Sequence, residues 1–304
     1  MAFAQGSRSS LAFIAESAFG VTPSTPTFAF LPINSHSLDL TKDRVEGNEI
    51  QADRMPRVDR HGNRQAGGSI EGDLRKGDFD EMFESAFLNA FSTNVLKVGT
   101  TPKFFSMEDA AQDISQFRLF KGMSVSSASL SIAPNQMVTG AFEMVGKDMT
   151  QAATTGSTGG GPTASSANQP FDSYSGTISD GGSGISIVTS IDFSITNSFA
   201  PTFIVGSASA QSLEYGRAVV EGTMTVYYED QTLINKFLNE TESSIEVSVD
   251  DPTGANPYTF LFPRVKYNGA AVPVQNQQSR LITLPFVSIF DSVEATNLKL
   301  TRTA

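Results

Sequence analysis

The chain contains one stretch that is written twice, 150 residues apart. Residues 70–90 align without a gap with residues 220–240. Average composition predicts roughly one or two identities in a window of this length. The alignment has six, at Glu71/Glu221, Gly72/Gly222, Asp80/Asp230, Phe87/Phe237, Leu88/Leu238 and Asn89/Asn239. Weaker echoes pair "SLDL" (37–40) with "SIDF" (190–193) and "MVTGAFE" (137–143) with "LITLPFV" (281–287). The sequence therefore predicts two copies of one domain.

Within the repeat, the spacing of apolar residues in each copy changes from a period of two residues, typical of a strand, to a period of 3.6 residues, typical of a helix. Apolar and polar residues alternate over 70–75 and 220–226, as in half-buried strands. Apolar residues then recur at helical spacing over 79–87 and 233–238, with Asp78 as the expected N-cap of the first helix. Further strands are expected over 129–132, 136–146, 256–267 and 279–290. We predict a mainly β (α+β) fold with two tandem β-sandwich or barrel domains, each with one flanking helix.

The same reading divides the chain into four parts. Residues 1–36 form an N-terminal arm, and residues 37–150 form the first domain with a charged loop at 42–64. Residues 151–186 are rich in Gly, Ser and Thr, a composition typical of a flexible or surface-draped connector. Residues 187–304 form the second domain and a C-terminal tail.

Composition excludes several functions. The chain has no cysteine, so disulfides and thiolate metal sites are impossible. Its formal charge is −11, and an acidic surface repels nucleic acid because phosphate binding needs clustered Lys and Arg. No apolar run approaches the length of a membrane span, and no secretory signal pattern opens the chain. We expect a soluble protein made in the cytoplasm, without membrane insertion.

No catalytic or cofactor site is evident. The chain has two histidines, His36 at a strand entrance and His61 in the charged loop, and neither has an evident triad partner. No nucleotide-binding, zinc-helix, EF-hand or nucleophile-elbow pattern is present. We predict that the protein is not an enzyme and has no cofactor and no metal.

Several segments carry a family resemblance that spans almost the whole chain. They are "RSSLAFIAESAFGVTPSTPTF" (8–28), "RHGNR" (60–64), "APNQMVTGAFEMVGKDM" (133–149), "VTSIDFSI" (188–195), "FLNETESS" (237–244), "FPRVKYNG" (262–269) and "PFVSIFD" (285–291). Together they resemble the major tail tube protein of long non-contractile-tailed bacteriophages. The resemblance implies a structural virion protein of the phage tail, assembled in the host cytoplasm. Such proteins form stacked rings around a channel for genome delivery, usually with six β-sandwich or barrel domains in a ring.

The repeat and the resemblance together predict an assembly. Two domains per chain allow a ring of three chains, a pseudo-hexamer, and a hexamer of chains is less favoured. DNA would pass through an acidic channel without specific binding, and other tail proteins would meet the tube ends. The lumen candidates are the acids that recur in both copies, Asp39, Glu71, Asp192 and Glu221, although edge ion pairs or solvent exposure explain them equally well.

The charged loop is the candidate for stacking one ring on the next, because its arginines can form bidentate bonds with carboxylates of a neighbouring subunit. The candidate residues are Glu46, Glu49, Asp53, Arg54, Arg57, Asp59, Arg60 and Arg64. A solvated loop without this role is the alternative. For the protein as a whole, the alternative is a virion decoration or host-adhesion module of repeated β domains, which loops rich in exposed aromatic residues would favour.

Overall fold

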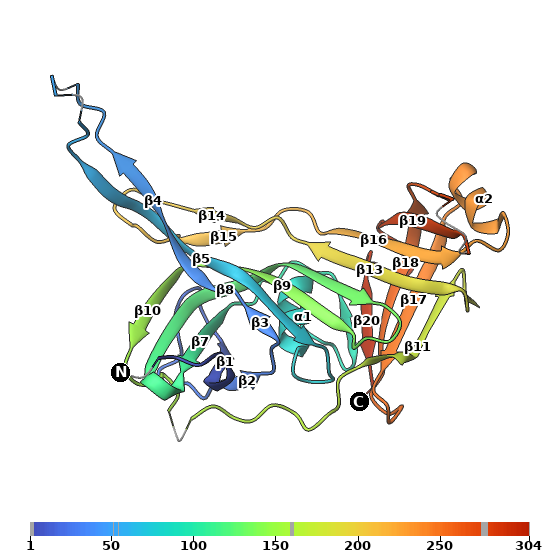
Figure 1. Cartoon of the computed structure of the whole chain (residues 1–304), viewed down its shortest axis with the longest axis horizontal. Coiled ribbons are helices and arrows are strands. Elements are labelled where there is room, and N and C mark those ends of the chain that lie inside the picture. Colours follow the sequence, from blue (N-terminus) through green and yellow to red (C-terminus); the bar gives the residue numbers. More distant parts are fainter. Residues whose placement is uncertain (1–2, 51, 54, 159–160, 275–278, 304) are drawn as a thin grey trace.

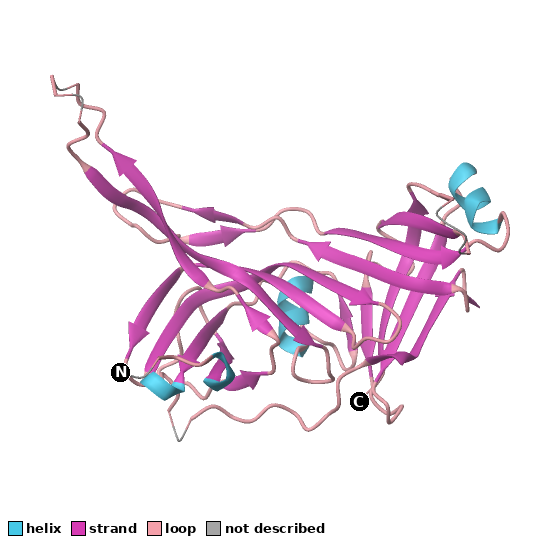
Figure 2. Ribbon diagram, viewed as in Figure 1, coloured by secondary structure: helices cyan, strands magenta, loops and turns pink. Residues whose placement is uncertain are grey.

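The computed structural model describes residues 3–50, 52–53, 55–158, 161–274 and 279–303, and these residues form a mainly β protein (Figure 2). The predicted fold class is thereby confirmed. Two α-helices accompany the strands in the described part of the chain, α1 (Asp80–Phe87) and α2 (Thr232–Leu238). Within the described residues 18 strands form one large, layered sheet that does not close into a barrel, and the other two form a separate two-stranded sheet.

One continuous antiparallel sheet runs through the molecule and is called here the central sheet. Its order is β4 (Asp39–Glu46), β5 (Asp59–Asp73), β9 (Thr139–Gly146), β8 (Gln116–Ile132), β13 (Val188–Thr196), β16 (Val219–Tyr227) and β19 (Leu281–Ser288). A short strand, β3 (Ser35–His36), pairs with β5 beyond the start of β4. The pairing of β8 with β13 joins the two halves of the chain edge to edge (Figure 1).

A second layer covers one face of the central sheet in each half. In the first half, residues 3–152, it contains β2 (Ala29–Leu31), β1 (Ser9–Ala15), β7 (Phe105–Ala111), the start of β8 and β10 (Asp148–Ala152). In the second half, residues 172–303, it contains β12 (Ser183–Gly184), β11 (Asp172–Asp180), β17 (Ser243–Asp250), β18 (Tyr258–Tyr267) and β20 (Lys299–Arg302). Strand β20 also pairs with β6 (Val95–Lys97) of the first half. The remaining elements are η1 (Gly6–Arg8), η2 (Gln112–Ile114) and the hairpin of β14 (Ala200–Thr202) and β15 (Ser212–Glu214).

The two halves repeat one order of elements and one pattern of pairing. The order β5, α1, β7, β8, β9 in the first half recurs as β16, α2, β17, β18, β19 in the second. The antiparallel pairs β5–β9, β7–β8 and β8–β9 recur as β16–β19, β17–β18 and β18–β19. The repeat seen in the sequence therefore corresponds to a repeated arrangement of strands.

The repeated glycines leave room for aromatic rings of the core. A Cβ added to Gly72 would lie 2.7 Å from Cζ of Phe79, and one added to Gly222 would lie 2.4 Å from Cζ of Phe286. The Gly222 Cβ would also meet the backbone oxygen of Asp192 at 2.7 Å, which cannot rotate away. Both positions therefore require glycine for close packing against the core.

Replacement of Gly222 by alanine is expected to destabilise the fold by about 1–3 kcal/mol, the usual cost of overpacking a filled core. Equilibrium denaturant unfolding measures this loss. Gly184→Ala is the matched control, since a Cβ at Gly184 meets no atom within 4 Å and the change should stay within about 0.5 kcal/mol. Equal unfolding midpoints for the two variants would contradict this explanation of the repeated glycine.

The two helices differ sharply in burial although they occupy equivalent places in the repeat. In α1 the residues Met82, Phe83, Ser85, Ala86 and Phe87 are buried, whereas α2 has no buried residue. Leu88, just after α1, is 3% exposed, but its counterpart Leu238 is 66% exposed. The predicted cap is wrong: the N-cap of α1 is Phe79 without a side-chain bond. The Asp78 carboxylate instead accepts a hydrogen bond from the backbone N–H of Ser166 at 2.7 Å.

Helix α1 is buried between strands of its own half and strands of the second half. The ring of Phe83 packs against Tyr258 and Phe260 of β18, with centroids 6.3 and 5.8 Å apart. Asn197, which follows β13 and is 1% exposed, donates a hydrogen bond of 2.7 Å to the backbone oxygen of Ala86. The helix therefore lies beneath the junction of the two halves.

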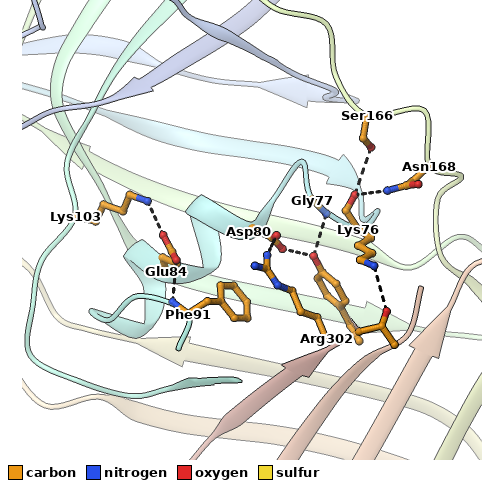
Figure 3. A network of polar contacts seen from close by, with 11 residues as sticks. Lys76, Gly77, Asp80, Glu84, Phe91, Lys103, Ser166, Asn168 and Arg302 are labelled. Atoms are coloured by element: carbon orange, nitrogen blue, oxygen red, sulfur yellow. Dashed lines mark hydrogen bonds and ion pairs between the residues drawn. The ribbon is translucent and has the colours of Figure 1, made fainter. Parts of the chain in front are cut away.

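Polar contacts complete this junction (Figure 3). The Asp80 carboxylate accepts hydrogen bonds from the guanidinium of Arg302 and the hydroxyl of Tyr258. The Tyr258 hydroxyl in turn accepts a bond from the backbone N–H of Gly77 at 3.1 Å, and burial raises the pKa of this tyrosine. The C-terminal residues of β20 thus bind to the first half of the same chain.

The charged segment 42–64 is a β-hairpin that projects from the body of the protein (Figure 1). We call it the first arm; it contains parts of β4 and β5 and a tip at 47–58. Residues 197–218, between β13 and β16, occupy the equivalent place in the second half, and this second arm includes the β14–β15 hairpin. Both tips expose aliphatic side chains: Ile50 is 100% exposed and Val205 is 103% exposed.

The N-terminal segment and the connector both contain strands. Strand β1 lies between β2 and β7 in the second layer, so residues 9–15 are part of a sheet. The connector drapes along the first half, where the Thr158 N–H bonds to the Pro26 oxygen at 2.7 Å and the Thr163 N–H bonds to the Phe28 oxygen at 2.8 Å. It then enters the second layer of the second half as β11.

Candidate functional site

Three of the four predicted lumen residues lie on one exposed face of the central sheet. Strand pairing joins Glu71 of β5 to Glu221 of β16 through a row of directly opposite residues. The row continues to β19 and reads Glu71, Ala141, Ser129, Ser194, Glu221 and Val287. Because side chains alternate across a strand, all members of such a row point to the same side. The identical glutamates of the repeat therefore share one surface.

Two neighbouring rows have the same character. One row reads Asp73, Thr139, Ser131, Asp192, Thr223 and Pro285, and the other reads Ser69, Glu143, Ser127, Thr196 and Val219. The three rows contain five carboxylates and no Lys, Arg or His. We call this surface the acidic face. Glu71, Asp192 and Glu221 also line a shallow trough in it.

The opposite side of the same strands forms the core. Between the rows stand Ile70, Phe142, Ala128, Ile195 and Val220, all of which are buried. The strict alternation of small or acidic residues with large apolar ones fixes which side faces solvent, since a slip by one residue would invert both faces.

Short polar side chains donate hydrogen bonds to three of the five carboxylates. Ser35 donates to Glu71 at 3.2 Å, Ser131 donates to Asp192 at 2.5 Å, and Asn34 donates to Asp73 at 2.9 Å. These are neutral donors, so the negative charge of each carboxylate stays uncompensated. The first basic residue along the Glu71 row is Lys266 on β18, which pairs with Val287 at the end of the row.

Asp39 stands apart from this surface. On β4, Asp39 lies opposite Gly67 of β5, whereas on β13, Asp192 lies opposite Thr223 of β16. The repeat aligns Thr223 with Asp73 and not with Gly67. The prediction that Asp39 and Asp192 are equivalent positions is therefore wrong. The two "S-x-D" segments resemble each other, but they sit at different registers of their hairpins.

Asp39 belongs to a mixed charge cluster. The guanidinium of Arg118 is 3.8 Å from Asp39 and 2.7 Å from Asp109. Burial acts to raise the pKa of Asp109, but bonds and charges of His36 and Arg118 outweigh it and hold that pKa below its ordinary value. The Nε2 atom of His36 lies 3.4 Å from Oδ1 of Asp109, so this histidine contacts a carboxylate that the sequence did not reveal.

The first-arm residues pair mainly among themselves. Arg44 binds Glu46 and Asp59, and Arg57 binds Asp53. The predicted stacking residues Glu46, Glu49, Asp53, Arg57, Asp59 and Arg60 are exposed, and Arg54 lies outside the described residues. Exposed ion pairs of this kind contribute little to stability.

Arg64 has a different role from the rest of the first arm. Its Nη2 atom is 2.7 Å from the Asp148 carboxylate, and its Nε donates to Ser209 of the second arm at 3.0 Å. Its backbone N–H also donates to the Ala208 oxygen at 2.8 Å. Arg64 therefore attaches the second arm to the base of the first.

Sequence reasoning missed the second arm. A signal was present, because 22 residues separate Thr196 from Val219, far more than the two to five that a hairpin between β13 and β16 requires. The insertion has few charges, unlike the first arm, and so did not stand out by composition.

Within the described residues, no three His, Asp or Glu side chains are grouped so that they could hold a metal ion. None of the described helices is long and apolar enough to cross a membrane.

The protein combines a repeated, sandwich-like β unit with a broad acidic face on its central sheet. The model of the phage tail tube protein family matches residues 6–288. The chain belongs to this family. It is thus a structural protein of the phage tail, and the family is not an enzyme family. Membership implies self-assembly into a tube together with other tail proteins. A comparison with curated proteins gives no significant match.

Proposed function

We propose that three copies of this chain form each ring of the tail tube, and that the rings stack around a channel lined by the acidic face. The observation that carries the proposal is the β8–β13 pairing, which joins two sandwich-like units side by side within one chain. Two units per chain then supply six similar units from three chains. Closing the ring in the same way would leave no free sheet edge inside it.

The acidic face suits a channel that DNA must cross without stopping. Its carboxylates repel phosphates along the whole path, so no position offers the DNA a stable binding site. The small Ser, Thr and Ala side chains between the acids keep the wall smooth. We assign the lining to Glu71, Asp192 and Glu221 with Asp73 and Glu143, and favour Asp39 less because of its contact with Arg118.

We also propose a division of the chain into two tube domains that follows the strands. The first comprises residues 9–152, since β1, β2 and β10 pair within its second layer. The second starts at Asp172, where β11 enters the layer formed with β17. Residues 153–171 would then be the connector. Assembly in the host cytoplasm belongs to the same proposal.

The number of chains per ring tests the proposal directly. Cryo-electron microscopy of purified tubes should give rings of three chains with a channel walled by the acidic face, and native mass spectrometry of dissociated rings should give the mass of a trimer. Six chains per ring would refute the trimer. A protein that forms no hollow rods would instead favour the decoration or adhesion module.

A further inference from the structure

The junction between the two halves of the chain consists of the β8–β13 strand pairing, helix α1 beneath it and Asn197 at the end of that helix. Each can be compared with the open edges of the central sheet. Residues 127–131 of β8 pair with β9, and residues 127–132 pair with β13 on the other side. Helix α1 lies beneath this seam, with Phe83 against Tyr258 and Phe260 of the second half. Asn197 closes the C-terminal end of the helix through the Ala86 oxygen.

The equivalent parts of the second half are uncovered. Helix α2 occupies the place of α1, yet its apolar stripe of Leu233, Ile234 and Phe237 is only half-buried. Leu238 is 66% exposed although its counterpart Leu88 is 3% exposed. An apolar helix face that is buried in one half and exposed in the other indicates that α2 lacks, within the single chain, the packing partner that α1 has.

The sheet edge beside α2 is open as well. Strand β18 pairs with β19 up to Tyr267, and the chain continues along β19 through a bridge between Ala271 and Thr283. Among the described residues, no strand pairs with the other edge of 268–272. At the opposite end of the central sheet, the described strands β3 and β4 pair only with β5.

The repeat sets the register at which these two edges would meet. Ser194 pairs with Glu221 just as Ser35 pairs with Glu71, so β3 is the counterpart of β13. In the first half, Ser129 of β8 pairs with Ala141 of β9, which itself pairs with Glu71. In the second half, Lys266 of β18 pairs with Val287 of β19, which itself pairs with Glu221. Lys266 is therefore the counterpart of Ser129. Since Ser129 pairs with Ser194 inside the chain, Lys266 should face Ser35 of the next chain.

We propose that α2 and the edge at 266–272 bind the β3 edge of a second copy of this chain, in the way that the first half binds the second. This inference rests on the proposed ring and specifies its seam between chains. There the ammonium of Lys266, which lies 3.8 Å from Glu242 and 3.9 Å from Glu240 of its own chain, would arrive beside Glu71, to which Ser35 is bonded. The next copy would then cover α2, including Leu238, as Tyr258 and Phe260 of the second half cover Phe83 of α1.

A substitution at Leu238 tests the covered helix face. Leu238→Asp places a charge in the seam but on an exposed position of the single chain, so the folded chain should remain and ring formation should be lost. Val293→Asp is the control, because Val293 is 89% exposed on a turn whose Glu294 contacts Lys97 of the same chain. Circular dichroism and unfolding midpoints check the fold, and electron microscopy counts rings. Rings of the Leu238→Asp variant at the normal yield would overturn the inference.

A cysteine pair tests the register, and the chain has no cysteine of its own to interfere. The double variant Ser35→Cys, Lys266→Cys, assembled and bridged with a short bismaleimide, should give linked dimers and trimers on a denaturing gel. Each single variant should stay monomeric. Tubes that form but give no linked chains would refute this seam while leaving the tube function intact, whereas failure of the unaltered chain to form rings would refute the proposed function itself.

Discussion

Removal of the first-arm tip is expected to leave folded chains and rings that cannot stack into tubes. Glu46 and Asp59 are direct partners across the hairpin, so a two-residue Asn-Gly turn can replace residues 47–58 and close β4 onto β5. The tip contains Ile50, which is 100% exposed, and Met55, which is 65% exposed. Such apolar residues on a projecting hairpin gain free energy only when a neighbouring surface covers them.

Negative-stain microscopy and sedimentation measure this outcome, with single rings or short stacks in place of long rods. Arg44→Ala is the matched control, because Arg44 pairs with Glu46 and Asp59 inside the arm and its loss should leave tubes unchanged. Tubes of normal length from the shortened chain would show that the first arm has no part in stacking.

Charge reversal on the acidic face is expected to turn a channel that DNA slides through into one that holds it. In the variant Glu143→Lys, Glu221→Lys, both residues are exposed and neither lies on an edge strand of the proposed seam between chains, so the chain should fold and assemble normally. Ammonium groups repeated around every ring would then bind phosphates. Duplex DNA should remain bound to these tubes at low salt, and phage that carry the variant should eject their genome poorly.

Salt dependence separates this electrostatic effect from a structural defect. Binding through roughly six or more phosphates should weaken by about 10³-fold or more between 50 and 200 mM salt. The control is Asp113→Lys, Glu246→Lys, which changes the net charge equally but lies on η2 and β17, outside the acidic face. Normal genome ejection and no bound DNA in the Glu143/Glu221 variant would show that the acidic face does not line the channel.

The strands, the helices and the shared acids could be predicted because each depends on local pattern. Alternation over 70–75 marks a half-buried strand wherever it lies, and the repeat identifies Glu71 with Glu221 without any knowledge of partners. That these two glutamates stand in one row across the sheet follows from the pairing of β8 with β13, which no local pattern specifies. Long-range pairing of this kind needs the structure.

The errors have a common physical origin. Asp78 has the residue type and position of an N-cap, but a backbone N–H of the connector binds its carboxylate first. Asp39 resembles Asp192 in sequence, yet its strand lies at a different register on β5. The exposure of Leu238 was equally hidden, because an apolar position predicts burial and does not say whether its own chain supplies the cover.

The β8–β13 seam bears on how ring assembly depends on concentration. Six separate units need five association steps before the last seam closes within the ring, and each step costs roughly 4 kcal/mol or more in lost translational and rotational freedom. In the proposed ring every second seam is built into the chain, so two association steps bring the three chains together and the third seam closes within the ring. Ring formation would then vary with about the third power of chain concentration, and nucleation would proceed at lower protein levels early in infection.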